Sequence, residues 1–405
     1  MMHQYYKFVS ILLSLMISGY NSAQGWKILK SLPDSASERH HPVTFAQDGF
    51  GFVGLGSSPT DFLEDFYRYN PAKDEWTGLR KFPGGPRTLA IGLNYNNKAF
   101  AGFGVDSNGT YKSDLWEYYN NTDTWVMRDS CPCEGRIHPA LVAVNNKIFV
   151  GLGFGATFMN LNDWWEYSID SNKWRRMADF PGSARHHPYQ FGIEPYAYVG
   201  MGHGEMIYND LYRFDPSNNS WKEMLVLPDE GRVAGTQFNF NGKGYILSGQ
   251  GDDHGYMDEG EFYEYDPIGN SWKQLTPHPG GSRWAPGSFM IDDKVYFTCG
   301  EDEISYKKDL MMYDFDILKT KQINDEENIS IHSISDDHII IQSKSSKIKS
   351  INVYQVDGKL VLDNRIKDKS SNSAEIDISQ FISGVYIIKL EDDHNRTYAY
   401  KISKK

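Results

Sequence analysis

Six arginines recur along the chain at nearly constant spacing. Each stands 17 residues before a glycine: Arg39, Arg87, Arg136, Arg185, Arg232 and Arg283. A guanidinium group can hold a carboxylate through two parallel hydrogen bonds, which suits an acidic sugar or an acidic peptide. Alternatively, an arginine present in every unit donates to backbone carbonyls of neighbouring loops and holds the units together. The spacing alone leaves both roles open.

Three of the six units carry a histidine two positions after the arginine. These are His41, His138 and His187, where the other units have Leu89, Ala234 and Ala285. Imidazoles at equivalent positions suit a metal site or a pH-sensitive polar lining. A metal is disfavoured because no familiar metal-ligand spacing occurs and because the first and fourth units should lie on opposite sides of a ring. We therefore expect a polar lining and neither metal nor cofactor.

The variable loops of the later units add further polar and aromatic candidates for binding. Within them stand His203, Tyr208 and His254, and Trp284 follows one of the repeated arginines directly. Such a mixture suits the hydroxyls and ring faces of a sugar, or a peptide. The alternative is an acidic loop that is simply solvated.

A second series explains which elements must position these side chains. Tryptophans at 26, 76, 125, 174, 221 and 272 are 50, 49, 49, 47 and 51 residues apart, and most follow an alternating strand and a turn, as in "DFYRYNPAKDEW". Tight-turn pairs such as Asp48-Gly49 and Asn241-Gly242 stand nine and ten residues after most of the arginines and indicate hairpins. Each unit therefore predicts four antiparallel strands, the pattern of a propeller blade.

The two ends of the repeat region predict how the ring closes. The sixth unit has Thr320 where its tryptophan should stand, whereas Trp26 has no preceding strands. We expect the strand at Trp26 to complete the sixth blade and leave no open sheet edge. The first strand of each blade should line the axis, and the arginines should ring the channel mouth.

Residues 24–320 resemble the kelch repeat, especially that of exported bacterial kelch proteins. The resemblance is carried by an aromatic residue seven positions before each repeated tryptophan after Trp26, by a glycine pair or G-x-G after the second strand, and by the six-fold spacing. Leu247 and Thr298 depart from it by replacing the first glycine of that motif. It implies a six-bladed all-β propeller, but kelch propellers include both binding modules and enzymes.

Composition and termini indicate an exported protein. Residues 1–23 have one lysine, an apolar run and a small-residue end, which is typical of a signal peptide, and no other stretch is apolar enough to span a membrane. The net charge is −12, and residues 24–320 hold 27 basic against 40 acidic side chains, which disfavours nucleic acid and anionic membrane as partners. Only three cysteines occur; Cys131 and Cys133 are placed for a local disulfide, and Cys299 should be buried.

The tail, residues 325–405, predicts a small β-sandwich. Its run "INVYQVDGKLV", followed by "IDISQFISGVYIIKL" and a lysine-rich end, resembles the type A C-terminal sorting domain of the type IX secretion system. The resemblance implies that the type IX machinery is a partner and that the protein is secreted or displayed on the cell surface. The alternative is an accessory β-domain.

Two functional hypotheses follow. The first is a recognition propeller that binds a glycan or an extracellular protein through the loop face of the channel. The second is a sugar-modifying enzyme resembling sialic-acid mutarotases, with an arginine holding a carboxylate and a histidine or glutamate as general acid and base. The long blade insertions expected of such enzymes are absent. A structural adhesin is a third possibility that nothing in the sequence requires.

Overall fold

The computed structural model describes residues 25–315 of the chain and much of the tail, namely 329–335, 338–344, 346–355, 359–365, 371–382, 384–394 and 396–404. The predicted signal peptide, residues 1–23, lies outside the described residues, as do 316–328.

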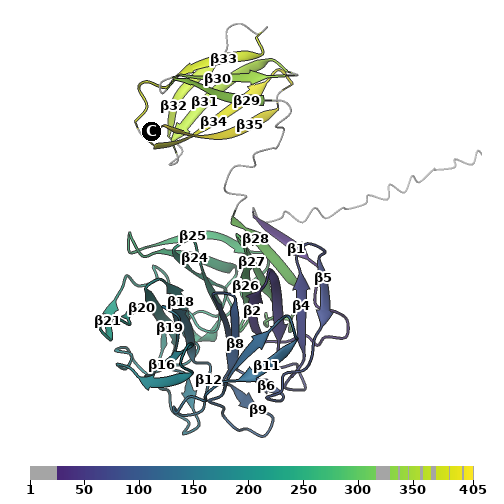
Figure 1. The fold of residues 1–405 in the computed structure, drawn as a ribbon, viewed down its shortest axis with the longest axis vertical. Coiled ribbons are helices and arrows are strands. Elements are labelled where there is room, and N and C mark those ends of the chain that lie inside the picture. Colours follow the sequence, from purple (N-terminus) through teal and green to yellow (C-terminus); the bar gives the residue numbers. More distant parts are fainter. Residues whose placement is uncertain are drawn as a thin grey trace, which may run out of the picture.

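Six four-stranded antiparallel sheets form the blades of a propeller (Figure 1), as the repeat predicts. Blade one contains β2 (Val43–Gln47), β3 (Phe50–Gly54), β4 (Phe66–Asn70) and β5 (Glu75–Gly78). Blade two contains β7 (Ile91–Tyr95), β8 (Lys98–Gly102), β10 (Leu115–Tyr119) and β11 (Thr124–Met127). Blade three contains β13 (Ala140–Val144), β14 (Lys147–Gly151), β16 (Trp164–Ser168) and β17 (Lys173–Arg176).

The remaining blades follow the same order. Blade four contains β18 (Tyr189–Ile193), β19 (Tyr196–His203), β20 (Ile207–Asp215) and β21 (Ser220–Glu223). Blade five contains β22 (Thr236–Phe240), β23 (Lys243–Leu247), β24 (Gly260–Asp266) and β25 (Ser271–His278). Blade six contains β26 (Gly287–Ile291), β27 (Lys294–Thr298), β28 (Leu310–Asp314) and β1 (Trp26–Leu29). The loops contain two short strand pairs and one 3-10 turn. The pairs are β6 (Arg87–Thr88) with β9 (Val105–Asp106), and β12 (Arg136–Ile137) with β15 (Phe154–Gly155); the turn is η1 (Asp252–His254).

Two-residue hairpins open every blade, which confirms the turn prediction. Gln47 pairs with Phe50 across Asp48 and Gly49, and Phe240 pairs with Lys243 across Asn241 and Gly242. Both residues of these turns have positive φ, which asparagine, aspartate and glycine adopt at little cost. The turn chemistry therefore sets the register of the inner two strands locally.

The first strands form a closed ring around the axis. Strands β2, β7, β13, β18, β22 and β26 contact one another in turn, and β26 contacts β2 again. Neighbouring blades pack tightly enough that Gly51 accepts no side chain, because a Cβ there would lie 2.0 Å from the ring of Phe289 in blade six. Apolar clusters between adjacent blades form the core, as in the contact of Phe45 and Phe52 with Tyr118.

The N-terminal strand closes the ring as predicted. Strand β1 pairs with β28, and Trp26 stands opposite Tyr313 in the same register that places Trp76 opposite Tyr69 in blade one. Trp26 is only 3% exposed and packs against rings of blades five and six. Blade six is therefore built from both ends of the repeat region.

Hydrogen bonds between blades explain why a tryptophan recurs at the fourth strand. The indole N–H of Trp76 donates to the Lys30 carbonyl at 2.8 Å, and that of Trp26 donates to the Thr276 carbonyl at 3.0 Å. The same bond, to a carbonyl of the preceding blade, is made by Trp174, Trp221 and Trp272. Trp125 lacks it among the described residues. The repeated indole thus ties five of the six blades to their predecessors.

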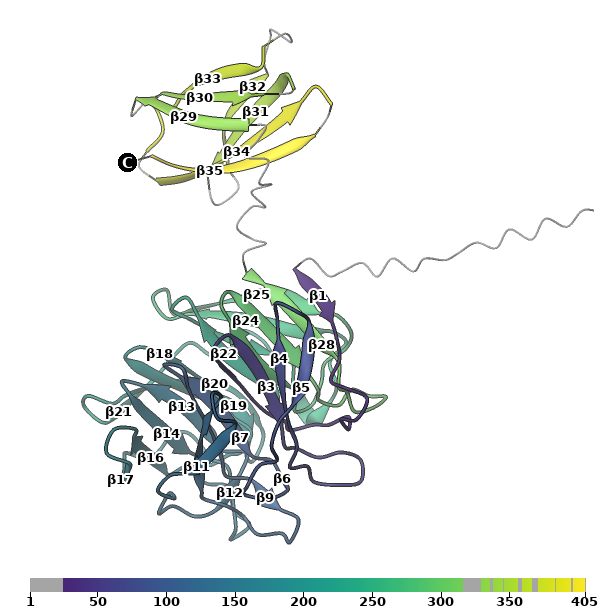
Figure 2. The ribbon, with the colours of Figure 1, turned by 45° about the vertical axis from the view of Figure 1, so that its right-hand side comes forward.

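The tail folds into two small antiparallel sheets that share a core (Figure 2), in agreement with the predicted β-sandwich. One sheet contains β29 (Ile329–Ser335), β30 (His338–Ser343) and β33 (Ser373–Asp377); the other contains β32 (Leu360–Arg365), β31 (Ile348–Gln355), β34 (Gly384–Asp392) and β35 (Thr397–Lys404). Buried isoleucines from both sheets, including Ile341 and Ile388, meet in the core. Among the described residues, no helix has the length and apolarity needed to cross a bilayer.

Candidate functional site

The six repeated arginines are buried inside the propeller, where they are between 0 and 5% exposed. Arg87 is representative, because its Nη1 and Nη2 donate to the two carboxylate oxygens of Asp114 at 2.7 and 3.0 Å. Its Nη1 also donates to the Phe103 carbonyl at 3.1 Å. None of the six lines the cavity at the channel axis. The structure therefore supports the role of holding loops and strands together, and their binding of a ligand stays an untested prediction.

The carboxylates that pair with these arginines were missed by the sequence analysis. They stand at or directly before the third strand of each blade: Asp65, Asp114, Asp163, Asp210, Glu261 and Asp309. A signal was present, since an acidic residue opens every copy of the "DFYRY" motif. A periodic acidic residue therefore accompanies the periodic arginine and neutralises it in every blade.

The position two residues after each arginine has a left-handed backbone in all six blades. The φ angles there lie between 48° and 58°, whether the residue is histidine, leucine or alanine. Backbone hydrogen bonds link these positions between blades: His41 N–H donates to the Ala285 carbonyl at 2.8 Å, and His187 N–H to the His138 carbonyl at 3.1 Å. This belt of backbone bonds brings the side chains of different blades to the axis.

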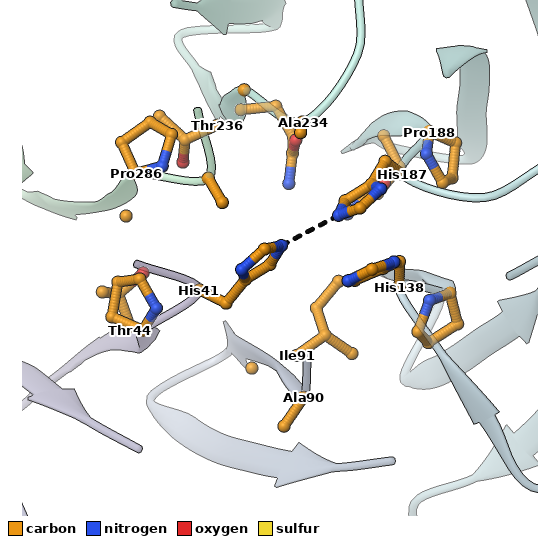
Figure 3. Close-up of a pocket in the computed structure, with 18 residues that line it drawn as sticks. His41, Thr44, Ala90, Ile91, His138, His187, Pro188, Ala234, Thr236 and Pro286 are labelled. Carbon is orange, nitrogen blue, oxygen red and sulfur yellow. Dashed lines mark hydrogen bonds between the residues drawn. The ribbon is translucent and has the colours of Figure 1, made fainter. Parts of the chain in front are cut away.

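Three histidines consequently meet at the centre of the channel. Figure 3 shows His41 and His187 pointing toward one another, with their Nε2 atoms 2.9 Å apart, and His138 beside them. The ring of His138 stacks on His187 with centroids 3.2 Å apart, and both of its buried ring nitrogens lack a hydrogen-bond partner. Blades one and four do lie on opposite sides of the ring, as expected, but this does not keep their histidines apart, because the left-handed backbone directs both side chains inward across the axis.

Burial keeps these imidazoles neutral. Loss of hydration lowers the pKa of His41, His138 and His187 well below the ordinary value, and the neighbouring histidines add to the effect. Burial likewise lowers the pKa of His40 and of His186 to about 4. At neutral pH each ring therefore presents one N–H donor and one lone pair.

Further histidines extend this group toward the loop face. On one side His40 Nδ1 lies 2.6 Å from His41 Nδ1, and on the other His203 Nδ1 lies 3.2 Å from His254 Nε2. We call the whole contiguous set the histidine band: His40, His41, His138, His186, His187, His203 and His254. Seven of the twelve histidines in the chain thus belong to one cluster.

The other predicted site residues divide into two groups. Trp284 joins the band, with its ring centroid 4.8 Å from His40 and 4.6 Å from His41. His203 and His254 belong to the band itself. Tyr208 instead covers the guanidinium of Arg185 at 3.8 Å, so it shields a structural ion pair. The structure therefore gathers the predicted histidines and Trp284 but leaves the arginines apart from them.

Two adjoining cavities run along the axis. The first, of about 100 Å³, is lined by the three central histidines and by prolines and small residues of the first strands. The second, of about 430 Å³, lies toward the hairpin turns and is lined by Asn94, Tyr95, Glu194 and Asn239 among others. This second cavity was not expected from the sequence, because the predicted binding residues point to the opposite, loop face.

A third cavity, of about 270 Å³, lies between the variable loops of blades five and six. Its lining is Tyr256, Met257, Asp258, Gly281, Ser282, Asp302, Glu303 and Ile304, which we call the loop-face cleft. One of its carboxylates, Asp302, pairs with Lys307 at 2.6 Å. The cleft therefore combines an aromatic ring, a hydroxyl and several carboxylates, some of them exposed.

The disulfide prediction is confirmed, since Cys131 and Cys133 are bonded to each other, and Cys299 is free and buried as expected. Burial raises the pKa of the Cys299 thiol to about 11, which makes it a poor nucleophile. The cysteines are thus part of the packing and not of the candidate site.

Comparison with known proteins matches two parts of the chain to others. Residues 335–405 match the family described as the secretion system C-terminal sorting domain. N-acetylneuraminate epimerases of Escherichia coli (strain K12) and Shigella sonnei (strain Ss046) are 37% identical to the chain over 81 residues, which is 18% of this chain and 21% of theirs. The aligned part is thus about a fifth of those relatives' length. The chain carries a type IX C-terminal sorting domain, and elsewhere its similarity to a curated enzyme is partial.

Proposed function

We propose that this protein is exported by the type IX secretion system and acts outside the cell as a recognition propeller that binds a neutral glycan at the loop-face cleft. The sorting-domain match supports export across the outer membrane, and the predicted signal peptide supplies the first step across the inner membrane. The glycan-binding part of the proposal rests on the chemistry of the cleft.

The observation that carries it is the lining of the loop-face cleft. Tyr256 offers a ring face on which a pyranose can stack, and the carboxylates of Asp258 and Glu303 can accept hydrogen bonds from sugar hydroxyls. Its volume of about 270 Å³ suits a short piece of a glycan.

Charge favours a neutral sugar over an acidic one. A sialic or uronic acid needs a cation beside its carboxylate, but the six repeated arginines are already paired with internal acids. The cleft itself adds three acidic side chains, and the lysine beside it, Lys307, pairs with Asp302. An acidic sugar would therefore meet repulsion there.

A glycan array probed with the full chain tests this proposal. We expect binding to neutral glycans, weakened about tenfold or more by Tyr256→Ala, because the stacking face is lost. Ile268→Ala, at a position 97% exposed on an outer turn of the same blade, is the matched control and should bind like the wild type. No binding to any glycan, together with capture of an extracellular protein, would replace this proposal by the protein-recognition alternative.

A second candidate function is sugar modification, favoured by the partial similarity to N-acetylneuraminate epimerases. On that hypothesis a histidine of the band would move a proton at the sugar. Nuclear magnetic resonance of N-acetylneuraminate incubated with the full chain distinguishes the two. Faster interconversion of sugar forms would support the enzyme, whereas an unchanged rate together with neutral-glycan binding supports the recognition role.

A further inference from the structure

The three histidines at the axis have a geometry that glycan binding at the loop-face cleft does not use. They come from blades one, three and four, and one ligand nitrogen of each lies within 4.8 Å of those of the other two. The same position in other blades is filled by Ala234 and Ala285, so the fold itself does not require an imidazole there. The histidines therefore need an explanation of their own.

One tautomer of His41 satisfies its hydrogen bonds and leaves a lone pair on Nε2. If its Nδ1 carries the proton, it donates to Nδ1 of His40 at 2.6 Å, and His40 in turn donates from Nε2 to the Tyr306 hydroxyl at 3.1 Å. The Nε2 of His41 then carries a lone pair directed at Nε2 of His187, 2.9 Å away. A neutral His187 that carries its proton on Nε2 donates to this lone pair, so the two rings share one N–H···N hydrogen bond in the absence of a metal.

The same chain of hydrogen bonds is the outer support that metal-binding histidines require. A ligating imidazole almost always donates its other N–H to a partner that fixes its tautomer and orientation. His40, held by Tyr306 and packed against Trp284, supplies that support to His41. His138 adds a third ring with both nitrogens unpartnered, so a metal would give one of them its missing interaction.

The ligand set selects the kind of metal. Three imidazoles without a carboxylate suit zinc, copper or nickel and not magnesium or calcium, which prefer oxygen ligands. Metal–nitrogen bonds of about 2.0–2.1 Å place tetrahedral ligand nitrogens about 3.3 Å apart, so the 2.9 Å pair must open slightly and His138 must move inward. Rotations about the side-chain χ angles of the histidines can produce shifts of this size.

We propose that His41, His138 and His187 form a binding site for one divalent transition-metal ion of the zinc class at the channel axis. On binding, coordinate bonds from three ring nitrogens replace the hydrogen bond between His41 and His187. The proton of that bond moves to Nδ1 of the ring that carried it. The three ligands leave a fourth position facing the cavity of about 100 Å³, which holds a water or a small ligand.

Metal titration of the full chain tests this inference. After chelator treatment and dialysis, we expect calorimetry to show one tightly bound Zn²⁺ per chain and no binding of Mg²⁺. His138→Ala and His187→Ala should each weaken Zn²⁺ binding at least tenfold. Alanine is compatible with this backbone, because Ala234 and Ala285 occupy it at φ 54° and 48°. His203→Ala, elsewhere in the histidine band, is the matched control and should leave the affinity unchanged.

Cu²⁺ provides a second readout that does not depend on affinity. Its electron paramagnetic resonance spectrum should show coupling to three nitrogens in the wild type and to fewer in His187→Ala, provided that circular dichroism shows the variant folded. The inference is overturned if the wild type binds no Zn²⁺ or Cu²⁺. It is also overturned if His138→Ala and His187→Ala bind like the wild type while His394→Ala abolishes binding, since the ion would then sit at Asp392, Asp393 and His394.

Discussion

At the scale of single residues, the buried arginine pairs stabilise the propeller. Arg87 is 1% exposed and its partner Asp114 is 16% exposed, and removal of the guanidinium leaves that carboxylate without its cation. We expect Arg87→Ala to lower the free energy of unfolding by about 3–5 kcal/mol, measured by urea denaturation. Arg176→Ala removes the surface pair with Asp179 and should cost less than about 1 kcal/mol. Equal effects of the two substitutions would contradict the structural role assigned to the repeated arginines.

A buried histidine outside the band predicts part of the acid sensitivity. His278 is 2% exposed, and burial, aided by the charge of Arg283, lowers its pKa to about 3. Its ring nitrogens lie 3.0 Å from the Ser248 hydroxyl and from the Pro279 carbonyl. The ring is therefore fully engaged in its neutral form.

The direction in which pH changes the free energy of unfolding follows from comparing the protonation of His278 in the folded and unfolded chain. Above about pH 6.5 neither state protonates His278, but as the pH falls from 6.5 toward 3 only the unfolded chain gains that proton. The free energy of unfolding should fall by at most about 1.4 kcal/mol per pH unit from this residue. His278→Gln should show a shallower loss between pH 6 and 4 in urea denaturation. Parallel curves for the two proteins would show that the group does not contribute.

At the scale of elements, strand β1 determines whether the ring is closed. Trp26 is buried against Phe262 and Tyr313 and donates to the Thr276 carbonyl. We expect Trp26→Ala to cost about 3–5 kcal/mol in unfolding free energy and to promote self-association, because β28 then lacks a firm partner. Trp76→Ala, at the equivalent but half-buried position of blade one, should cost less and leave the chain monomeric in light scattering. The closure model is contradicted if the two variants behave alike.

The repeat predicted the elements well because their determinants are local. Turn pairs such as Asp48-Gly49 fix each hairpin, and the period-two pattern fixes which face of each strand is buried. The meeting of His41 with His187 could not be predicted in this way, because it depends on a left-handed backbone position and on side chains that reach across the axis. The carboxylates that pair with the arginines could be predicted from the sequence, but only by comparing the series of periodic arginines with the series of periodic acidic residues.

At the scale of the whole molecule, the tail and the propeller carry separate roles. Residues 335–405 match a sorting domain, which accounts for export, and that match does not bear on what the propeller binds. The propeller has more acidic than basic side chains, and its repeated arginines are already paired with internal carboxylates. Both features favour the proposed neutral ligand over an acidic one. On the proposed function, ligand binding depends on the variable loops of blades five and six and not on the repeated framework.

The most direct measurement is a calorimetric titration of the full chain with the neutral glycan that gives the strongest array signal. The account predicts one site per propeller, affinity lost by about tenfold or more in Tyr256→Ala and retained in Ile268→Ala, and no binding of N-acetylneuraminate under the same conditions. The opposite pattern, with N-acetylneuraminate bound and neutral glycans ignored, would contradict it. So would neutral-glycan binding that is indifferent to Tyr256→Ala.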